Sequence, residues 1–306
     1  MNSSRFKYPW FTSFGIVLLL FILVNFVFFP LFNSGDDVFL LYNLSGGFGD
    51  TPTHLLHYDH IWHPVLAKPV AWLYSNYPTL NWYTLLLLSF QIAGCTATLY
   101  VLSRRFHAVT ALGIFLLLFC FIGSRALLSL TFTYSAWIIA AGGFCLLLHE
   151  SIGVKRKWFN LVFAGILLLL AGLLRLQVLL AVTVLFIPVF LMNARYKFRI
   201  WVPIMLAVWV LVYLSNLQQK QYYRTHIPGW AQEEKMRQSL FYSFNRPNNW
   251  KRPLLEVFRD STEAALYGGQ FFFDTSFFSA KRVSEISKAL TRVRDFREKD
   301  DWQALG

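Results

Sequence analysis

Long apolar segments recur along the first two thirds of the chain, and they restrict its fold more than any other feature. A membrane-spanning helix needs about 20 mostly apolar residues. Of the 306 residues, 56% are hydrophobic and only 14% are charged. We therefore predict an all-α, polytopic membrane protein with about seven transmembrane helices. The predicted segments are residues 11–32, 82–102, 109–122, 127–148, 159–174, 176–192 and 201–214.

The third, fifth and sixth of these segments are near or below the usual length of a span. We therefore expect two tight helical hairpins that turn at Arg125 and Arg175. The first segment has about twenty apolar residues and no small-residue cleavage site before Asn33. We interpret it as an uncleaved membrane anchor.

Basic residues fall mainly on one side of the predicted membrane. With a cytoplasmic N-terminus, ten Lys and Arg residues of the membrane region face the cytoplasm, and three face outward, namely Lys68, Arg125 and Arg175. The positive-inside bias favours this orientation. An odd number of spans then places the loop at residues 33–80 and the C-terminal region outside the cytoplasm.

The composition changes at residue 216, where a polar region begins. We predict a transmembrane module at 1–215 and a mostly helical polar region at 216–306, with helices at 231–243, 253–267 and 281–296. This region has 15 Lys or Arg residues interspersed with 11 Asp or Glu residues. Such mixed charge does not indicate a nucleic-acid partner.

Acidic residues are scarce in the membrane region, and two of them, Asp36 and Asp37, directly follow the first apolar segment. A carboxylate pair at the membrane boundary suits a general base that deprotonates a hydroxyl group. The alternative is structural: Asp36 caps a helix that begins at Val38, and Asp37 faces water.

The same loop continues with a glycine-rich stretch, Ser45–Pro52, whose backbone can approach a ligand closely. Asp50 lies in this stretch and is a candidate substrate contact. Further along, Pro64–Tyr77 has the pattern of a helix lying in the membrane surface. The second span then begins with aromatic residues at Trp82 and Tyr83, as in the aromatic belts of membrane proteins.

Four histidines recur at every third residue of this loop. On a regular helix the first and last of them would lie on opposite faces, so one metal ion cannot bind all four. Three interpretations remain: an amphipathic helix at the interface, a divalent-metal site, or contact with an anionic or sugar substrate. The histidines are His54, His57, His60 and His63; the metal candidates are Asp37, Asp59, His60 and His63; the substrate-contact candidates are His57 and His60.

An apolar anchor, an acidic pair at its outer end, a long external loop with a surface helix and then short hairpins together resemble the GT-C fold of integral membrane glycosyltransferases. Residues 36–88 also look like a group of bacterial multi-spanning proteins with an Asp-Asp, Ser-Gly, Gly-x-Pro, Leu-Tyr and Trp-Tyr pattern. GT-C enzymes usually carry further spans after the seventh, whereas here a polar region follows.

The resemblance implies an enzyme of the inner (cytoplasmic) membrane that acts on the extracytoplasmic face. Its donor would be a sugar on a polyprenyl-phosphate carrier, and its acceptor a cell-envelope glycan or lipid. Asp36 or Asp37 matches the base that activates the acceptor hydroxyl. Arg125 and Arg175 match the cations that neutralise the lipid phosphate, since Arg can contact phosphate through two N–H groups. The alternative is that both arginines simply extend to the membrane interface.

Two other functions remain open. A proton or metal permease would use the Asp and His loop as an entrance, and it would need polar residues inside several spans. The spans contain few besides Gln91, Arg175 and Gln177, which favours a surface site over a conducting path. The other alternative is a non-catalytic envelope assembly protein.

Overall fold

The computed structural model describes most of the membrane region and little of the polar region. The described residues are 6, 8–28, 31–32, 35–47, 51–55, 62–152, 157–192, 198–226, 281–282 and 285–286. The chain forms two compact units, residues 1–56 with 61–219, and residues 57–60 with 220–306. In the second unit, 281–282 and 285–286 are helical. The other residues of the helices predicted after residue 230 lie outside the described ones.

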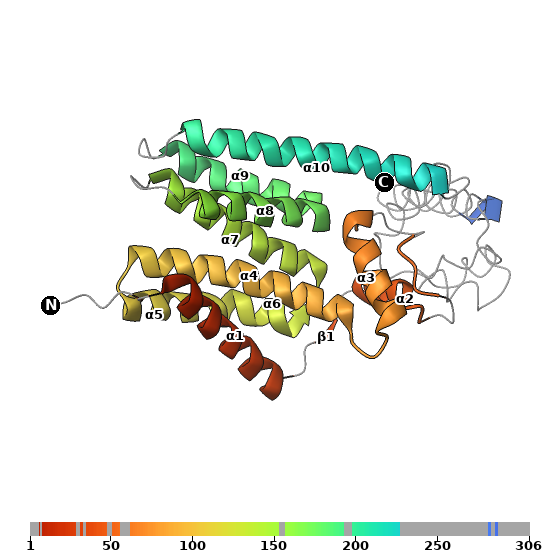
Figure 1. Cartoon of the computed structure of the whole chain (residues 1–306), viewed down its shortest axis with the longest axis horizontal. Coiled ribbons are helices and arrows are strands. Elements are labelled where there is room, and N and C mark those ends of the chain that lie inside the picture. Colours follow the sequence, from red (N-terminus) through yellow and green to blue (C-terminus); the bar gives the residue numbers. More distant parts are fainter. Residues whose placement is uncertain are drawn as a thin grey trace, which may run out of the picture. The chain divides into compact units, whose positions relative to one another are not determined.

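Apart from one pair of two-residue strands, the described elements are helical (Figure 1). In chain order they are α1 (Pro9–Val27), β1 (Leu31–Phe32), α2 (Gly35–Ser45), α3 (Pro64–Asn76), α4 (Trp82–Arg105), α5 (Ala108–Leu118), the π-helical turn η1 (Phe119–Gly123), α6 (Ser124–Leu128), β2 (Ser129–Leu130), α7 (Phe132–Ile152), α8 (Trp158–Leu174), α9 (Leu176–Met192) and α10 (Phe198–His226).

Five helices of the described chain are long and apolar enough to cross a membrane. They are α1, α4, α7, α10 and the 21-residue helix formed by α5, η1 and α6. The prediction of an all-α membrane protein is therefore confirmed as a fold class. Helices α8 and α9 are apolar but have only 17 residues each, so seven spans remain a prediction. The predicted helix at Pro64–Tyr77 is present as α3.

The first predicted hairpin turn is in the wrong place. The helix does not end before Arg125 but continues to Leu128, and the turn follows at residues 129–131. Arg125 is exposed in the last helical turn, where a cation is stabilised by the carbonyl end of the helix dipole. Its charge therefore does not terminate the helix. Arg175, by contrast, lies in extended conformation between α8 and α9.

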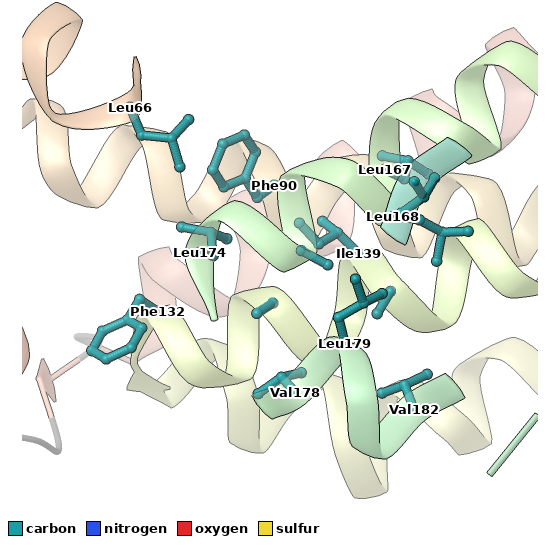
Figure 2. Close-up of a cluster of buried hydrophobic side chains, with 14 of the residues drawn as sticks. Leu66, Phe90, Phe132, Ile139, Leu167, Leu168, Leu174, Val178, Leu179 and Val182 are labelled. Atoms are coloured by element: carbon teal, nitrogen blue, oxygen red, sulfur yellow. The ribbon is translucent and has the colours of Figure 1, made fainter. Parts of the chain in front are cut away.

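Helix α7 is the centre of the bundle, with α4 packed on one side and α8 and α9 on the other. Figure 2 shows apolar side chains from these helices meeting around Ile139. Glycines allow the backbones of α4 and α7 to come into direct contact. A Cβ atom at Gly94 would lie 2.4 Å from the carbonyl oxygen of Ile138, and one at Gly142 would lie 2.5 Å from that of Gly94. Small residues serve the same purpose at many helix interfaces in membranes.

A buried polar network joins four helices at the C-terminal end of α7. The carboxylate of Glu150 accepts hydrogen bonds from Asn160 Nδ2 (2.5 Å) and from the backbone N–H of Lys157 (3.0 Å) at the start of α8. Asn160 also donates to the Tyr100 hydroxyl oxygen on α4 and accepts from Trp10 Nε1 on α1. These bonds satisfy polar groups that would otherwise be costly to bury.

A short parallel strand pair forms at the opposite end of the bundle. Leu31 pairs with Ser129, and Phe32 pairs with Leu130. This pairing brings the chain that follows α1 beside the chain that leads into α7. Because α2 begins three residues after β1, the acidic pair is placed near the start of α7.

Candidate functional site

Helix α2 carries both acidic residues in its first turn. It begins at Gly35, so the structural alternative in which Asp36 caps a helix at Val38 and Asp37 faces water is wrong. Asp37 is fully buried and lies on the same side of α2 as the buried Leu40 and Leu44. This spacing of three and seven residues defines one helical face. Asp36, one residue earlier, is half-buried.

The Asp37 carboxylate joins α2 to the starts of two other helices. Its Oδ1 atom accepts a 2.5 Å hydrogen bond from the Tyr83 hydroxyl on α4 and a 2.9 Å bond from the backbone N–H of Phe132 on α7. Hydrogen bonds to an ionised carboxylate are roughly twice as strong as neutral ones. Asp37 thus connects three segments that are far apart in sequence.

The first turn of α7 receives two caps from different parts of the chain. Thr131 Oγ1 accepts from the N–H of Tyr134 at 3.0 Å, as an N-cap side chain does. Asp37 accepts from the N–H of Phe132. The positive end of the helix dipole also favours a carboxylate here. The chain therefore places a carboxyl group at the start of α7.

Arg175 lies against the same turn of α7. Its Nη1 atom donates a 2.6 Å hydrogen bond to Thr133 Oγ1, and its guanidinium carbon lies 5.2 Å from the centre of the Phe132 ring. Since Asp37 binds the backbone of Phe132, the structure brings Asp37 and Arg175 together at residues 132–133. A guanidinium group has five N–H donors, and Thr133 accepts one of them.

Arg125, the other candidate for phosphate contact, is placed differently. It is exposed, and no hydrogen bond or ion pair joins its guanidinium group to the part of the chain that the structure describes. Of the two arginines, Arg175 is the one whose guanidinium group is held by contacts with described residues.

Aromatic packing supports the acidic site from the side of α3. The Trp62 ring is fully buried, and its centre lies 5.0 Å from that of Tyr83. Tyr83 in turn donates to Asp37. The sequence had indicated an aromatic belt at Tyr83, but in the folded protein this residue is buried inside the bundle.

His63 fixes the start of α3 to α10. The N–H of Val65 donates to its Nδ1 atom at 3.2 Å, so Nδ1 carries no proton and Nε2 must donate to the carbonyl oxygen of Ser215, 2.9 Å away. Both ring nitrogens are therefore used by the neutral imidazole. Burial lowers the pKa of His63 below the usual 6.5, although the hydrogen bond to Ser215 opposes this effect.

These contacts predict that acid weakens the fold through His63. Because its pKa is lower in the folded chain, the unfolded chain takes up the proton first as the pH falls below about 6.5. The free energy of unfolding should then decrease by about 1.4 kcal/mol for each unit of pKa difference. We expect His63→Asn to be less stable than wild type at pH 7.5 and to lose less stability between pH 7.5 and 5.5, measured by thermal unfolding in detergent.

The control for this prediction is His107→Asn. His107 precedes α5, is exposed and makes no capping hydrogen bond. Its substitution should leave the dependence on pH as in wild type. Equal losses on acidification in His63→Asn and wild type would show that His63 is not the titrating group.

The predicted metal and loop residues are only partly described. Asp50, His57, Asp59 and His60 lie outside the described residues. Of the remaining metal candidates, His63 uses both ring nitrogens, and Asp37 Oδ1 already accepts two hydrogen bonds. Within the described ranges, no group of three or more His, Cys, Asp or Glu side chains is arranged to hold a metal ion.

The sequence does not predict that Tyr83, Phe132 and Thr133 belong to this site. Phe132 contributes its backbone N–H and its ring, and neither role leaves a pattern in the sequence. The spacing of Asp37 with Leu40 and Leu44 was a usable signal, since it predicts that Asp37 lies on the buried face of its helix. No family model, curated protein or solved structure matches this chain.

Proposed function

We propose that the chain is a GT-C-like membrane glycosyltransferase that moves a sugar from a polyprenyl-phosphate carrier to an envelope glycan or lipid. The observation that carries this proposal is that Asp37, one residue of the acidic pair, and Arg175 both contact the first turn of α7. A base and a phosphate-binding cation are the two groups that such a transfer needs, and here they come from α2 and from the α8–α9 junction.

In the proposed reaction, the acidic pair handles the proton and Arg175 contacts the phosphate. The acceptor hydroxyl loses its proton to a carboxylate of the acidic pair, and its oxygen forms a bond to the anomeric carbon of the sugar. The bond between that carbon and the phosphate oxygen breaks, and the lipid phosphate leaves with the electron pair. The Arg175 guanidinium stabilises the negative charge that develops on the phosphate.

A structural role for the acidic pair is the second candidate, and it corresponds to a non-catalytic assembly protein. It is favoured by one observation: Asp37 binds a helix start in the same manner as Glu150. Transport receives less support, because the buried Gln91 in α4 donates to Ala126 O and Ser135 Oγ and so joins helices.

Transfer by the purified protein tests the proposal. Wild-type protein in liposomes, supplied with lipid-linked sugars and envelope glycans extracted from a host that lacks the gene, should transfer sugar to the glycan. The double variant Asp36→Asn/Asp37→Asn should show no transfer, because amides cannot accept the proton. Equal transfer by both proteins would show that neither carboxylate of the acidic pair acts as the base. Absence of transfer by the wild type with every extracted donor would contradict the proposed function.

A further inference from the structure

The two adjacent carboxylates have different surroundings, and Asp37 is the one held within the bundle. It is fully buried and shares the packed face of α2 with Leu40 and Leu44. Its Oδ1 atom accepts from Tyr83 and from the N–H of Phe132. To accept a substrate proton, Asp37 would have to exchange these contacts for contact with an acceptor hydroxyl.

Glu150 provides an internal comparison at the opposite end of α7. Asp37 and Glu150 are the two buried carboxylates among the described residues. Each accepts from a side-chain donor, Tyr83 or Asn160, and from a backbone N–H at a helix start. Helix starts have N–H groups without a partner in the helix, and a buried carboxylate satisfies them. The same contacts at both ends of α7 indicate a shared role in joining helices.

Asp36 lies on a different face of α2 from Asp37. Consecutive residues of a helix are rotated by about 100°, so Asp36 leaves the face that Asp37 shares with Leu40 and Leu44. It is half-buried, whereas Asp37 is completely buried. A general base must reach the acceptor hydroxyl, and the more accessible of the two carboxylates meets this requirement.

We infer that Asp36 alone is the catalytic base and that Asp37 is a positioning residue that fixes the first turn of α2 against α4 and α7. This inference rests on the proposed function. Tyr83 has the same positioning role, since its hydroxyl holds Asp37 and its ring packs on Trp62. The buried contacts at Asp37 fix the first turn of α2, and Asp36 lies in that same turn.

Asparagine separates the two roles. The Oδ1 atom of an asparagine at position 37 can accept both hydrogen bonds, from Tyr83 and from Phe132, but an amide cannot act as a base. We therefore expect Asp37→Asn to retain transfer within about tenfold of wild type, with a lower melting temperature because its hydrogen bonds are weaker. Asp36→Asn should lose about 10²- to 10⁴-fold in kcat.

A third variant tests positioning directly. Asp37→Leu removes both hydrogen bonds, so it should melt at a lower temperature than Asp37→Asn. In the fraction that remains folded at low temperature, kcat should fall while KM for the lipid-linked donor stays near wild type, because Arg175 is unchanged. A general loss of folded protein would also lower the apparent kcat at an unchanged KM, so the rate is divided by the amount of folded protein that gel filtration shows in the same sample. If kcat per folded protein then equals that of wild type, Asp37 has no positioning role in the reaction.

The outcomes separate this inference from the proposed function. A loss of 100-fold or more in Asp37→Asn at an unchanged melting temperature, or full transfer by Asp36→Asn, would overturn the division of roles. A melting temperature of Asp37→Leu equal to that of wild type would overturn the positioning role of Asp37. If the wild type transfers no sugar but Asp37→Leu is strongly destabilised, the proposed function fails while the structural role of Asp37 stands.

Discussion

Gly142→Leu is expected to prevent accumulation of the folded protein. A Cβ atom at this position would lie 2.5 Å from the backbone oxygen of Gly94 and 2.8 Å from its Cα, so relief requires that α4 and α7 move apart. This helix pair is central to the bundle, and it cannot separate without leaving voids around Ile139 (Figure 2). We expect a loss of more than about 3 kcal/mol, a large part of the stability of a typical domain.

The matched control is Gly113→Leu on α5. A Cβ atom there has no heavy atom within 4 Å, and the residue is exposed on an apolar helix. Both variants add the same side chain to a helix interior, where leucine is favoured over glycine. Gel filtration in detergent should show folded protein for Gly113→Leu and wild type, and little for Gly142→Leu. Similar yields of the two variants would contradict the close packing of α4 and α7.

Arg175→Met is expected to lower transfer by about 10²-fold or more, the size of effect seen when a group that stabilises transition-state charge is removed. Arg175 is held against the start of α7 by Thr133 and by the ring of Phe132. Arg175→Lys should retain part of the activity, because it keeps the charge but not the paired N–H donors. Transfer rates at saturating lipid-linked donor measure this loss.

Arg125→Met provides the comparison for Arg175. Both arginines lie at the predicted outer side, Arg125 in the last turn of α6 and Arg175 between α8 and α9. Arg125 is exposed, and the described residues give its guanidinium no hydrogen bond. We expect less than a threefold change in transfer, about 0.6 kcal/mol. A larger loss in the Arg125 variant than in the Arg175 variant would reverse the assignment of the phosphate contact.

The sequence was most informative where hydropathy alone decides the structure. A continuous apolar run predicts a membrane helix because the bilayer satisfies no backbone polar group, and the helices α1, α4 and α7 follow from this rule. It was less informative about helix ends. The apolar pattern predicts that the third segment ends before Arg125, yet a cation in the last helical turn is stable there. Similarly, α10 continues to His226, although the apolar pattern predicts that this span ends at Leu214.

The candidate site was predicted in part. The acidic pair and Arg175 were identified because charge is rare in the membrane region, but their meeting at the start of α7 depends on the pairing of β1 with β2. A strand of two residues leaves no pattern in the sequence. Which residues of two distant segments pair depends on how the whole chain folds. The close contact between the backbones of α4 and α7 at Gly94 and Gly142 also depends on how distant segments pack together.

The most direct test of the proposed transferase activity is the amount of lipid-linked sugar in a host that lacks the gene, complemented with wild type or with Asp36→Asn. If Asp36 is the base of the transfer, the lipid-linked donor accumulates and the sugar is missing from the surface glycan in the Asp36→Asn strain, while wild type restores both. Mass analysis of the lipid and glycan fractions would contradict this function if the deletion strain, the variant and the wild type all gave the same amounts.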